Sequence, residues 1–411
     1  MRRVTLDLPG CKSVSQRALI LAALAQGESR LVGLSTGDDS VFLQQALRQL
    51  GWSLELDDCG SLLVVGRHGP QTATVDALTL GEGGSTLRFL VPLLAAVPQD
   101  LMLGLAPGLR ARPQQVMVDA LAQFGASLTP TASGFHLQSS GRALPQEMQI
   151  PVDLSSQFFS GFLMASGKQA QSWKLGSEPV SRGYLDMTVC MLQQFRGPDV
   201  LQIQAHGWQQ QAGYGLGQDL QIPSDASAVV FFAVAAILQQ REIQIRSPWD
   251  LSHPDIAVLN FLRQNGLLQV EGTTLVPMPA AAVAASSGVP IFDLQDSPDS
   301  GPALAVLASQ MPNGMVFRNP ERLRFKESNR LDGMQHLAAI LGGTMSARAG
   351  ELRVKPGALT HTQAAFDSCN DHRLAMAAGI ASLRYPQLKI AGQGCVAKSF
   401  PDFWNQLARL Q

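Results

Sequence analysis

Six short clusters of hydroxyl, cationic and acidic side chains recur along the chain, and most of them stand where a helix is expected to begin. The first, residues 9–17, reads Pro-Gly-Cys-Lys-Ser-Val-Ser-Gln-Arg and gathers Lys12, Ser13 and Arg17 around one helix N-terminus. The N–H groups and the dipole of such an end attract anions, which Lys and Arg bind through charge-assisted hydrogen bonds. A solvated Lys/Arg face is the alternative, but the helix that follows is almost wholly apolar and should be buried. The cluster therefore predicts a phosphate or carboxylate site.

The second and third clusters offer backbone N–H groups and neutral side chains. A glycine-rich loop, residues 81–84, leads into Ser85 at the next expected helix start, and Arg112 follows it before a proline. Glycines let a backbone approach a phosphate closely, although this is not a Walker A loop and a tight turn explains it equally well. Residues 155–157, Ser-Ser-Gln, suit a polyhydroxylated ligand, while helix capping alone also accounts for the serines.

The last three clusters combine carboxylates with cations. They read Ser-Pro-Asp at residues 297–299, Arg-Phe-Lys-Glu-Ser-Asn-Arg at residues 324–330, and Asn-Asp-His-Arg at residues 370–373. A salt-bridged surface helix would explain the second of these, and a lone His-Arg pair is more often structural. Each cluster alone is ambiguous, but all six in one chain indicate a cleft that attracts anions.

A repeat of about 70 residues positions these clusters. Amphipathic stretches that end in glycine lead into alternating apolar residues typical of strands, and the glycines lie 74, 72, 69 and 76 residues apart. Glycine adopts the left-handed conformation that ends a helix, and expected helix starts keep the same period. The spacing predicts six copies of an α+β unit whose helix starts can face one cleft, although any repeat protein spaces its caps evenly. The glycines are Gly51, Gly125, Gly197, Gly266 and Gly342, and the expected starts are Ser13, Ser85, Ser155, Asp225, Asp299 and Asp371.

Composition excludes several other classes of protein. Apolar residues make up 45% of the chain and the net charge is −1, which is typical of a packed globular protein and not of a polycation that coats nucleic acid. Five scattered cysteines without CxxC spacing predict neither a disulfide framework nor a zinc site. We find no signal peptide and no apolar run long enough to span a membrane, so we expect a cytoplasmic protein.

The motifs, taken in order, resemble those of the EPSP synthases from Pro9 to the end of the chain. They read Pro-Gly-x-Lys-Ser-x-Ser-x-Arg, Gly-Glu-Gly-Gly-Ser-Thr-Leu-Arg, Arg-Pro, Ser-Ser-Gln, Ser-Arg-x-Tyr, Asp-Ala-Ser, Pro-Asp, Lys-Glu-Ser-x-Arg, Asn-Asp-His-Arg and Ala-Lys-Ser-Phe-Pro. The resemblance implies an α/β (α+β) fold, a two-domain inside-out α/β barrel built from six βαβαββ repeats with the active site in the interdomain cleft. One globular half would hold residues 9–221, and the other residues 1–8 plus 222–411.

The resemblance also implies a set of functional residues. The shikimate 3-phosphate ligands would be Lys12, Ser13, Arg17, Ser155, Ser156, Gln157, Ser181, Tyr184, Asp299 and Lys326. The phosphoenolpyruvate ligands would be Lys12, Gly84, Arg112, Gln157, Glu327, Arg330, Arg373 and Lys398. Asp299, Glu327 and Lys12 would be catalytic, and His372 and Ser85 would support them.

The implied reaction joins two small anions by addition and elimination. Asp299 would take the proton of the 5-hydroxyl group as that oxygen attacks C2 of phosphoenolpyruvate, and Glu327 or Lys12 would protonate C3. Loss of phosphate would then give the enol ether. The resemblance implies no metal, no organic cofactor, and no nucleic-acid or membrane partner, and we expect a monomer that binds the inhibitor glyphosate.

Several positions depart from the commonest pattern of this family, namely Glu82, Phe89, Arg322, Gln16, Gly183 and Asn329. Of these, Glu82 and Phe89 could alter affinity for phosphoenolpyruvate or glyphosate. The alternatives are a UDP-N-acetylglucosamine enolpyruvyl transferase, an RNA 3′-phosphate cyclase-like protein and a binding homologue without activity. The first of these carries a Lys-Asn pair and a loop cysteine, where this chain has Lys12 followed by Ser13 and an Arg-Ala-Arg segment.

Overall fold

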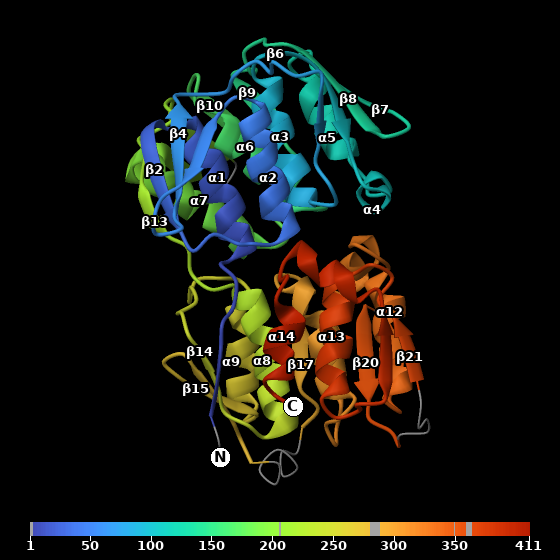
Figure 1. Ribbon diagram of the computed structural model, residues 1–411. Helices are drawn as coiled ribbons and strands as arrows, with labels where there is room; N and C mark the ends of the chain where they lie inside the picture. Colours follow the sequence, from blue (N-terminus) through green and yellow to red (C-terminus); the bar gives the residue numbers. More distant parts are fainter. Residues whose placement is uncertain (1–2, 205–206, 280–287, 349, 359–363) are drawn as a thin grey trace. The chain divides into compact units, whose positions relative to one another are not determined.

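The chain forms two compact units, which we describe one at a time (Figure 1). The computed structural model describes residues 3–204, 207–279, 288–348, 350–358 and 364–411. Unit 1 comprises Met1–Pro9 with Pro223–Gln411, and unit 2 comprises Gly10–Ile222. These bounds fall one residue from the division expected from the motifs.

Unit 2 contains three four-stranded sheets of one topology. In each sheet the first strand is parallel to the second, and the second is antiparallel to one strand of the hairpin that follows. The first sheet has the order β13 (Asp219–Gln221), β2 (Gln26–Val32), β4 (Leu62–Arg67), β3 (Ser53–Leu56). The second is β5 (Ala77–Thr79), β6 (Pro98–Gly104), β8 (Gly134–Ser140), β7 (Ser127–Pro130). The third is β9 (Glu147–Gln149), β10 (Gln171–Lys174), β12 (Gly207–Gln210), β11 (Leu201–Gln204).

Unit 1 repeats the same topology. Its first sheet is β1 (Val4–Leu6), β14 (Ile243–Ile245), β16 (Thr274–Pro277), β15 (Leu268–Glu271). Its second is β17 (Ile291–Asp293), β18 (Met315–Arg318), β20 (Glu351–Lys355), β19 (Thr344–Arg348). The last repeat contributes, among the described residues, the parallel pair β21 (Ala364–Asp367) and β22 (Leu388–Ala391). Five repeats therefore have the full βαβαββ pattern, whereas the sixth has, among the described residues, two strands and two helices without the hairpin. Each described sheet is open, so the term barrel does not denote a closed sheet.

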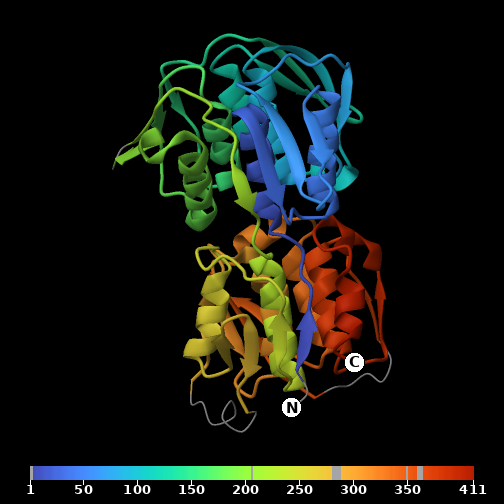
Figure 2. The same cartoon turned by 60° about the vertical axis from the view of Figure 1, so that its left-hand side comes forward.

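The first helix of every repeat is almost entirely buried. In each unit these helices lie inside and the sheets lie around them (Figures 1 and 2). They are α1 (Lys12–Leu24), α3 (Gly84–Ala95), α6 (Ser156–Ala165), α8 (Ala226–Gln239), α11 (Gly301–Ala308) and α13 (His372–Ser382). A helix that is apolar on all sides, as α8 is, has to be surrounded by other elements to leave water.

The remaining helices cover the sheets and are mostly amphipathic. The second helices of the repeats are α2 (Asp38–Gln49), α5 (Gln115–Ala122), α7 (Arg182–Arg196), α9 (Ile256–Gln264), α12 (Arg330–Ile340) and α14 (Phe403–Ala408). The described residues also include the short helix α4 (Pro107–Arg110). Their 3-10 segments are η1 (Pro198–Val200), η2 (Pro298–Ser300), η3 (Glu321–Phe325) and η4 (Gln393–Lys398). Among the helices that the structure describes, none has the length and apolar character needed to cross a bilayer.

The chain exchanges strands where it passes from one unit to the other. Strand β1 precedes α1 in sequence but pairs with β14 of unit 1, so that Val4 lies opposite Ile243. Strand β13 precedes α8 but pairs with β2 of unit 2, where Leu220 lies opposite Leu31. Each unit therefore closes one of its sheets with a strand from a distant part of the sequence.

The predicted helix ends are confirmed, whereas the predicted starts are right at three of six positions. All five glycines that end helices have a left-handed backbone, with φ between 66° and 93°. Ser155, Asp225 and Asp371 cap their helices with side-chain oxygens. The prediction is wrong for Ser13 and Ser85, which are second residues of helices whose N-caps are Cys11 and Gly83. Asp299 lies in η2 ahead of α11. The caps of α1 and α3 are Cys11 and Gly83, which carry no hydroxyl group, so the spacing of Ser and Asp residues alone does not locate these two helix starts.

Helices α3 and α6 are in close contact, so a larger side chain at that contact tests how tightly they pack. A methyl group on Gly161 of α6 would lie 2.1 Å from the backbone oxygen of Arg88 in α3. We expect Gly161→Ala to lower the free energy of unfolding by about 1–3 kcal/mol, because overpacking displaces both helices. Gly394→Ala is the control, since no described residue lies within 4 Å of a methyl group at that position. Denaturant titration measures both variants, and wild-type stability of Gly161→Ala would contradict this packing.

Candidate active site

In unit 2, Lys12 forms an ion pair at the start of α1. Its Nζ lies 3.0 Å from Oδ2 of Asp39 in the first turn of α2, and the two side chains are 14% and 3% exposed. A methyl group on Gly83 would lie 3.1 Å from Oδ1 of the same carboxylate. The starts of α1, α2 and α3 therefore lie close together, with Lys12 among them.

The glycine-rich loop brings a second group of predicted residues to the start of α3. A methyl group on Gly84 would lie 3.2 Å from Nη1 of Arg112 and 3.7 Å from Oε1 of Gln157. Arg88, one turn into α3, donates from Nη1 to Oε1 of Gln157 at 2.9 Å, and its guanidinium stacks on Phe158 at 4.3 Å. Only a residue without a side chain leaves room at position 84 for these groups and a ligand.

The start of α6 presents Ser155, Ser156 and Gln157 together, as predicted. Oγ of Ser155 accepts a hydrogen bond from the backbone N–H of Gln157 at 3.3 Å, while Ser156 is buried at the first position of the helix. Ser181 precedes α7 with φ of 53° and ψ of 49°. A non-glycine residue in this left-handed region costs energy and is common where side chains must be aimed at a ligand.

Arg17 is buried in unit 2 and fixed by three hydrogen bonds. It donates from Nε to Oγ1 of Thr188 at 2.8 Å, from Nη1 to the backbone oxygen of Ser13 at 2.8 Å, and from Nη2 to that of Tyr184 at 3.0 Å. Burial lowers the pKa of Arg17 to about 10, with Cys11 and Tyr184 opposing the shift. The side chain therefore keeps its positive charge at neutral pH.

In unit 1, Asp299 lies among three cations from separate segments. Its Oδ1 is 3.0 Å from Nζ of Lys326 and 2.7 Å from Nη1 of Arg330, and its Oδ2 is 3.6 Å from Nη2 of Arg373. Burial raises the pKa of Asp299, but Lys326, Arg330 and Arg373 together hold that pKa well below its ordinary value of 3.8. Asp299 is therefore ionised when no ligand is bound.

Glu327 and Asp371 continue this ion-pair network. Oε2 of Glu327 is 2.5 Å from Nη2 of Arg330, and its Oε1 is 3.2 Å from Nζ of Lys398. Asp371 caps α13, lies 2.8 Å from Nε of Arg330, and accepts a hydrogen bond from Oγ of Ser328 at 3.2 Å. Arg330 thus contacts three carboxylates. Burial lowers its pKa, but these carboxylates outweigh burial and raise the pKa above its ordinary value.

The network gathers several cations around its carboxylates. Four cations face three carboxylates, namely Lys326, Arg330, Arg373 and Lys398 against Asp299, Glu327 and Asp371. Burial lowers the pKa of Lys326, although Asp299 opposes the shift. Such a group of partly desolvated cations binds anions such as phosphates and carboxylates.

One set of side chains in unit 1 has the spacing of a metal site. The ligand atoms of this set, Glu327, Asp371 and His372, lie within 4.8 Å of one another. Both carboxylates are already paired with the guanidinium of Arg330. A divalent ion at that position would face this guanidinium at close range, so the donor set does not fit a metal. His372 is buried at the first position of α13.

The structure thus distributes the predicted residues over two groups, one in each unit. In unit 2 these are Lys12, Ser13, Arg17, Gly84, Ser85, Arg112, Ser155, Ser156, Gln157, Ser181 and Tyr184. In unit 1 they are Asp299, Lys326, Glu327, Arg330, His372, Arg373 and Lys398.

Sequence reasoning missed Asp39, Arg88 and Asp371 as members of these groups. Two acidic residues at the start of a helix are common without any function, so the sequence held no signal that singles out Asp39. Arg88 lies four residues after Gly84 and therefore on the same helical face, a spacing that could have indicated it. Asp371 appeared only as a cap, because its contact with Arg330 joins segments 41 residues apart.

Three of the unusual residues have identifiable surroundings. Phe89 is fully buried, and its ring centroid lies 5.1 Å from Cζ of Arg17. A methyl group on Gly108 would lie 3.6 Å from Oε1 of Glu82. Arg322 donates from Nη1 to the backbone oxygen of Gln295 at 3.0 Å. Phe89 therefore packs its ring against the guanidinium of Arg17.

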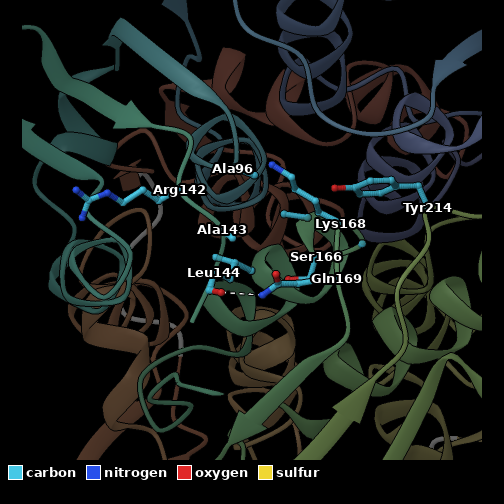
Figure 3. Close-up of a pocket in the computed structure, with 10 residues that line it drawn as sticks. Ala96, Arg142, Ala143, Leu144, Ser166, Lys168, Gln169 and Tyr214 are labelled. Carbon is cyan, nitrogen blue, oxygen red and sulfur yellow. Dashed lines mark hydrogen bonds between the residues drawn. The ribbon is translucent and has the colours of Figure 1, made fainter. Parts of the chain in front are cut away.

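A pocket of about 340 Å³, which includes solvent-open space, lies elsewhere in unit 2 (Figure 3). The hydrogen bond from Nε2 of Gln169 to the backbone oxygen of Leu144, 2.7 Å long, closes one side of it. Ala96 and Ser166 place it at the C-terminal ends of α3 and α6, whereas Gly84 stands at the opposite end of α3. None of the predicted residues lines this pocket, so it is distinct from the candidate site.

Comparisons with known proteins agree with the resemblance of the motifs. The family model described as "EPSP synthase (3-phosphoshikimate 1-carboxyvinyltransferase)" matches residues 3–407. The 3-phosphoshikimate 1-carboxyvinyltransferase of Pseudomonas savastanoi pv. phaseolicola is 32% identical over 98% of this chain and 93% of its own length. That of Nitrosomonas europaea is 30% identical over 98% of this chain and 95% of its own length.

Two solved structures share the fold. An EPSP synthase from Acinetobacter baumannii matches with a TM-score of 0.74 at 24% identity, covering 99% of this chain and 95% of that one. The enolpyruvyl transferase NikO from Streptomyces tendae matches with a TM-score of 0.74 at 16% identity, covering 99% of this chain and 94% of that one.

The buried pair of Asp371 and Arg330 predicts a large effect on stability. Both side chains are 0% exposed, so Asp371→Ala leaves an uncompensated buried charge and should cost about 3–5 kcal/mol of unfolding free energy. Asp186→Ala is the control, because that carboxylate forms a surface pair with Arg182 and is 51% exposed; about 0–1 kcal/mol is expected there. Equal losses of unfolding free energy in the two variants would show that the buried pair of Asp371 and Arg330 contributes no more to stability than a surface pair.

The depressed pKa of Asp299 predicts a pH dependence. Because the folded-state pKa lies below the ordinary value of 3.8, ionised Asp299 stabilises the folded state above the unfolded pKa, and this contribution is lost as pH falls toward the folded pKa. The difference in unfolding free energy between wild type and Asp299→Asn should be constant above about pH 5 and shrink below about pH 4. A difference that stays unchanged on acidification would contradict the ion pairs of Asp299.

Proposed function

The chain belongs to the EPSP synthase family, and from this membership we propose that it transfers the enolpyruvyl group of phosphoenolpyruvate to the 5-hydroxyl group of shikimate 3-phosphate. The reaction releases phosphate and serves the shikimate pathway to chorismate and aromatic amino acids. The observation that carries the proposal is the ionised carboxylate of Asp299 held among Lys326, Arg330 and Arg373. It places a base beside cations that suit two multiply charged substrates.

The two residue groups divide the binding work in this proposal. The hydroxyl groups and cations of unit 2 hold shikimate 3-phosphate, with Asp299 and Lys326 contributing from unit 1. The residues around Gly84 hold phosphoenolpyruvate, together with the cations paired to Glu327 in unit 1. Each phosphate carries about −1.5 to −2 at neutral pH, which accounts for the number of buried Lys and Arg side chains.

Asp299 acts as the base of the addition step. With its pKa held low by three cations, it is a weak base until the substrate anions compete for Lys326, Arg330 and Arg373. That competition weakens the ion pairs of Asp299, and its pKa then rises toward the range in which it accepts a proton. The bound phosphate and carboxylate groups thus switch on the base that acts on the neighbouring hydroxyl group.

Atoms and protons balance over the two steps. The 5-oxygen forms a bond to C2 of phosphoenolpyruvate as Asp299 takes its proton, and Glu327 or Lys12 gives a proton to C3. The ketal phosphate then loses phosphate from C2 and a proton from C3. The C3 proton returns to Glu327 or Lys12, and the proton held by Asp299 passes to the departing phosphate, so the enol ether forms and every side chain regains its starting protonation. Arg112, Arg330, Arg373 and Lys398 stabilise the charge of the departing phosphate.

The proposal covers partners as well. The substrates are small molecules, no nucleic acid or membrane takes part, and the enzyme works as a monomer in the cytoplasm. Glyphosate, which competes with phosphoenolpyruvate in this family, inhibits the enzyme by occupying the residues around Gly84.

A phosphate-release assay tests the reaction and its acceptor. We expect phosphate from phosphoenolpyruvate only when shikimate 3-phosphate is added, and none with UDP-N-acetylglucosamine. Asp299→Ala should lower kcat by about 10²–10⁴-fold, the range of a lost general base, while calorimetry still detects shikimate 3-phosphate. Asp293→Ala is the control, because this exposed carboxylate binds Asn319 and lies outside the network. Turnover with the nucleotide sugar, or near-normal kcat in Asp299→Ala, would overturn the proposal.

A further inference from the structure

Arg373 is buried in unit 1, yet its hydrogen bonds to other side chains are few. The residue is 3% exposed, its Nη2 lies 3.6 Å from Oδ2 of Asp299, and its Nε has no hydrogen-bond partner among the described residues. A long side chain held this way loses its orientation unless other contacts fix it. The surroundings of the guanidinium supply such contacts.

An aromatic ring lies against the guanidinium. Cζ of Arg373 is 5.6 Å from the ring centroid of Phe231, within the range in which a ring face attracts a cation. Phe231 is fully buried on α8, which packs against α13 where Arg373 resides. The guanidinium therefore lies close to a ring that is fully buried in the core of unit 1.

Two buried carboxylates lie near the start of α8, Asp225 at the N-cap of this helix and Asp255 at the N-cap of α9. Asp225 accepts a hydrogen bond from the backbone N–H of Ser227 at 2.8 Å. Oγ of Ser227 donates to Oδ2 of Asp255 at 2.5 Å. Both carboxylates are less than 5% exposed. Burial lowers the pKa of Arg373, but Asp299, followed by Asp225 and Asp255, outweighs burial and raises it.

The loop that carries Asp255 also anchors the turn that carries the base. The backbone oxygen of Pro254 accepts a hydrogen bond from Oγ of Ser297 at 3.1 Å, two residues before Asp299. Within the loop, the backbone N–H of Asp255 donates to Nδ1 of His253 at 3.1 Å. Residues 253–255 therefore contact the turn that precedes Asp299, and Asp255 adds negative charge to the surroundings of Arg373.

We propose that Phe231 is a positioning residue that orients the guanidinium of Arg373 toward phosphoenolpyruvate. The face of the ring attracts the cation and limits its movement. Phe231 does not touch the substrate and acts through Arg373. This inference rests on the proposed function, in which Arg373 is a ligand of phosphoenolpyruvate.

Adjacent phenylalanines on α8 provide a matched test. Phe231→Leu removes the ring but keeps an apolar side chain, and we expect the KM for phosphoenolpyruvate to rise about five- to thirtyfold, as loss of a desolvated cation–π contact implies. Phe232→Leu is the control, because that ring is equally buried but packs on Phe400 and Phe403 at 6.2 and 5.9 Å. The KM for shikimate 3-phosphate and the Tm should change alike in both variants, and Phe231→Tyr should retain the wild-type KM.

Arg373→Ala separates this inference from the function on which it rests. In that background Phe231→Leu should no longer change the KM for phosphoenolpyruvate, because the residue through which it acts is gone. An equal effect of Phe231→Leu with and without Arg373, or equal KM changes in Phe231→Leu and Phe232→Leu, would overturn the positioning role. If Arg373→Ala itself leaves that KM unchanged, the assignment of Arg373 as a phosphoenolpyruvate ligand fails.

Discussion

The guanidinium of Arg330 determines the arrangement of the site in unit 1. It is fully buried and contacts Asp299 at 2.7 Å, Glu327 at 2.5 Å and Asp371 at 2.8 Å. A buried charge is costly unless its donors are all paired, so the segments that bear these three carboxylates must meet around one side chain. These segments are a 3-10 turn, the approach to α12 and the cap of α13. The two carboxylates proposed for proton transfer therefore share one cation.

This arrangement explains how a low-pKa carboxylate can serve as a base. Without substrate, the cations are neutralised by the carboxylates that later exchange protons, which keeps the buried charges paired. In the proposed mechanism, substrate phosphates and carboxylates would compete for the same cations, and the pKa of Asp299 would then rise. Binding and activation of the base are thus one electrostatic event, and a fixed network lowers the reorganisation cost of the reaction.

The repeat supplies the scaffold for these charges. In unit 2 the starts of α1, α3 and α6 gather Lys12, Gly84 and Gln157, because buried first helices of equivalent repeats enter their core in the same direction. The exchange of β1 and β13 ties the ends of each unit to distant sequence. Unit 1 therefore completes a sheet with a strand from the other end of the chain, and unit 2 completes one by pairing its last strand with its first.

The sequence by itself determined the repeat, the helix-ending glycines and the types of residue at the helix starts. These follow from local physics, since apolar periodicity and the freedom of Gly51 or Gly342 to adopt positive φ need no distant partner. Its motifs also indicated the family. Only the tertiary structure decided that Asp39 pairs with Lys12, that Asp371 pairs with Arg330 and that Phe231 lies against Arg373. Such contacts join residues 27 to 142 positions apart, and nothing in their local sequence distinguishes them from capping or core residues. Which buried charges pair with each other depends on which helices pack together, and this packing is determined only when the chain folds.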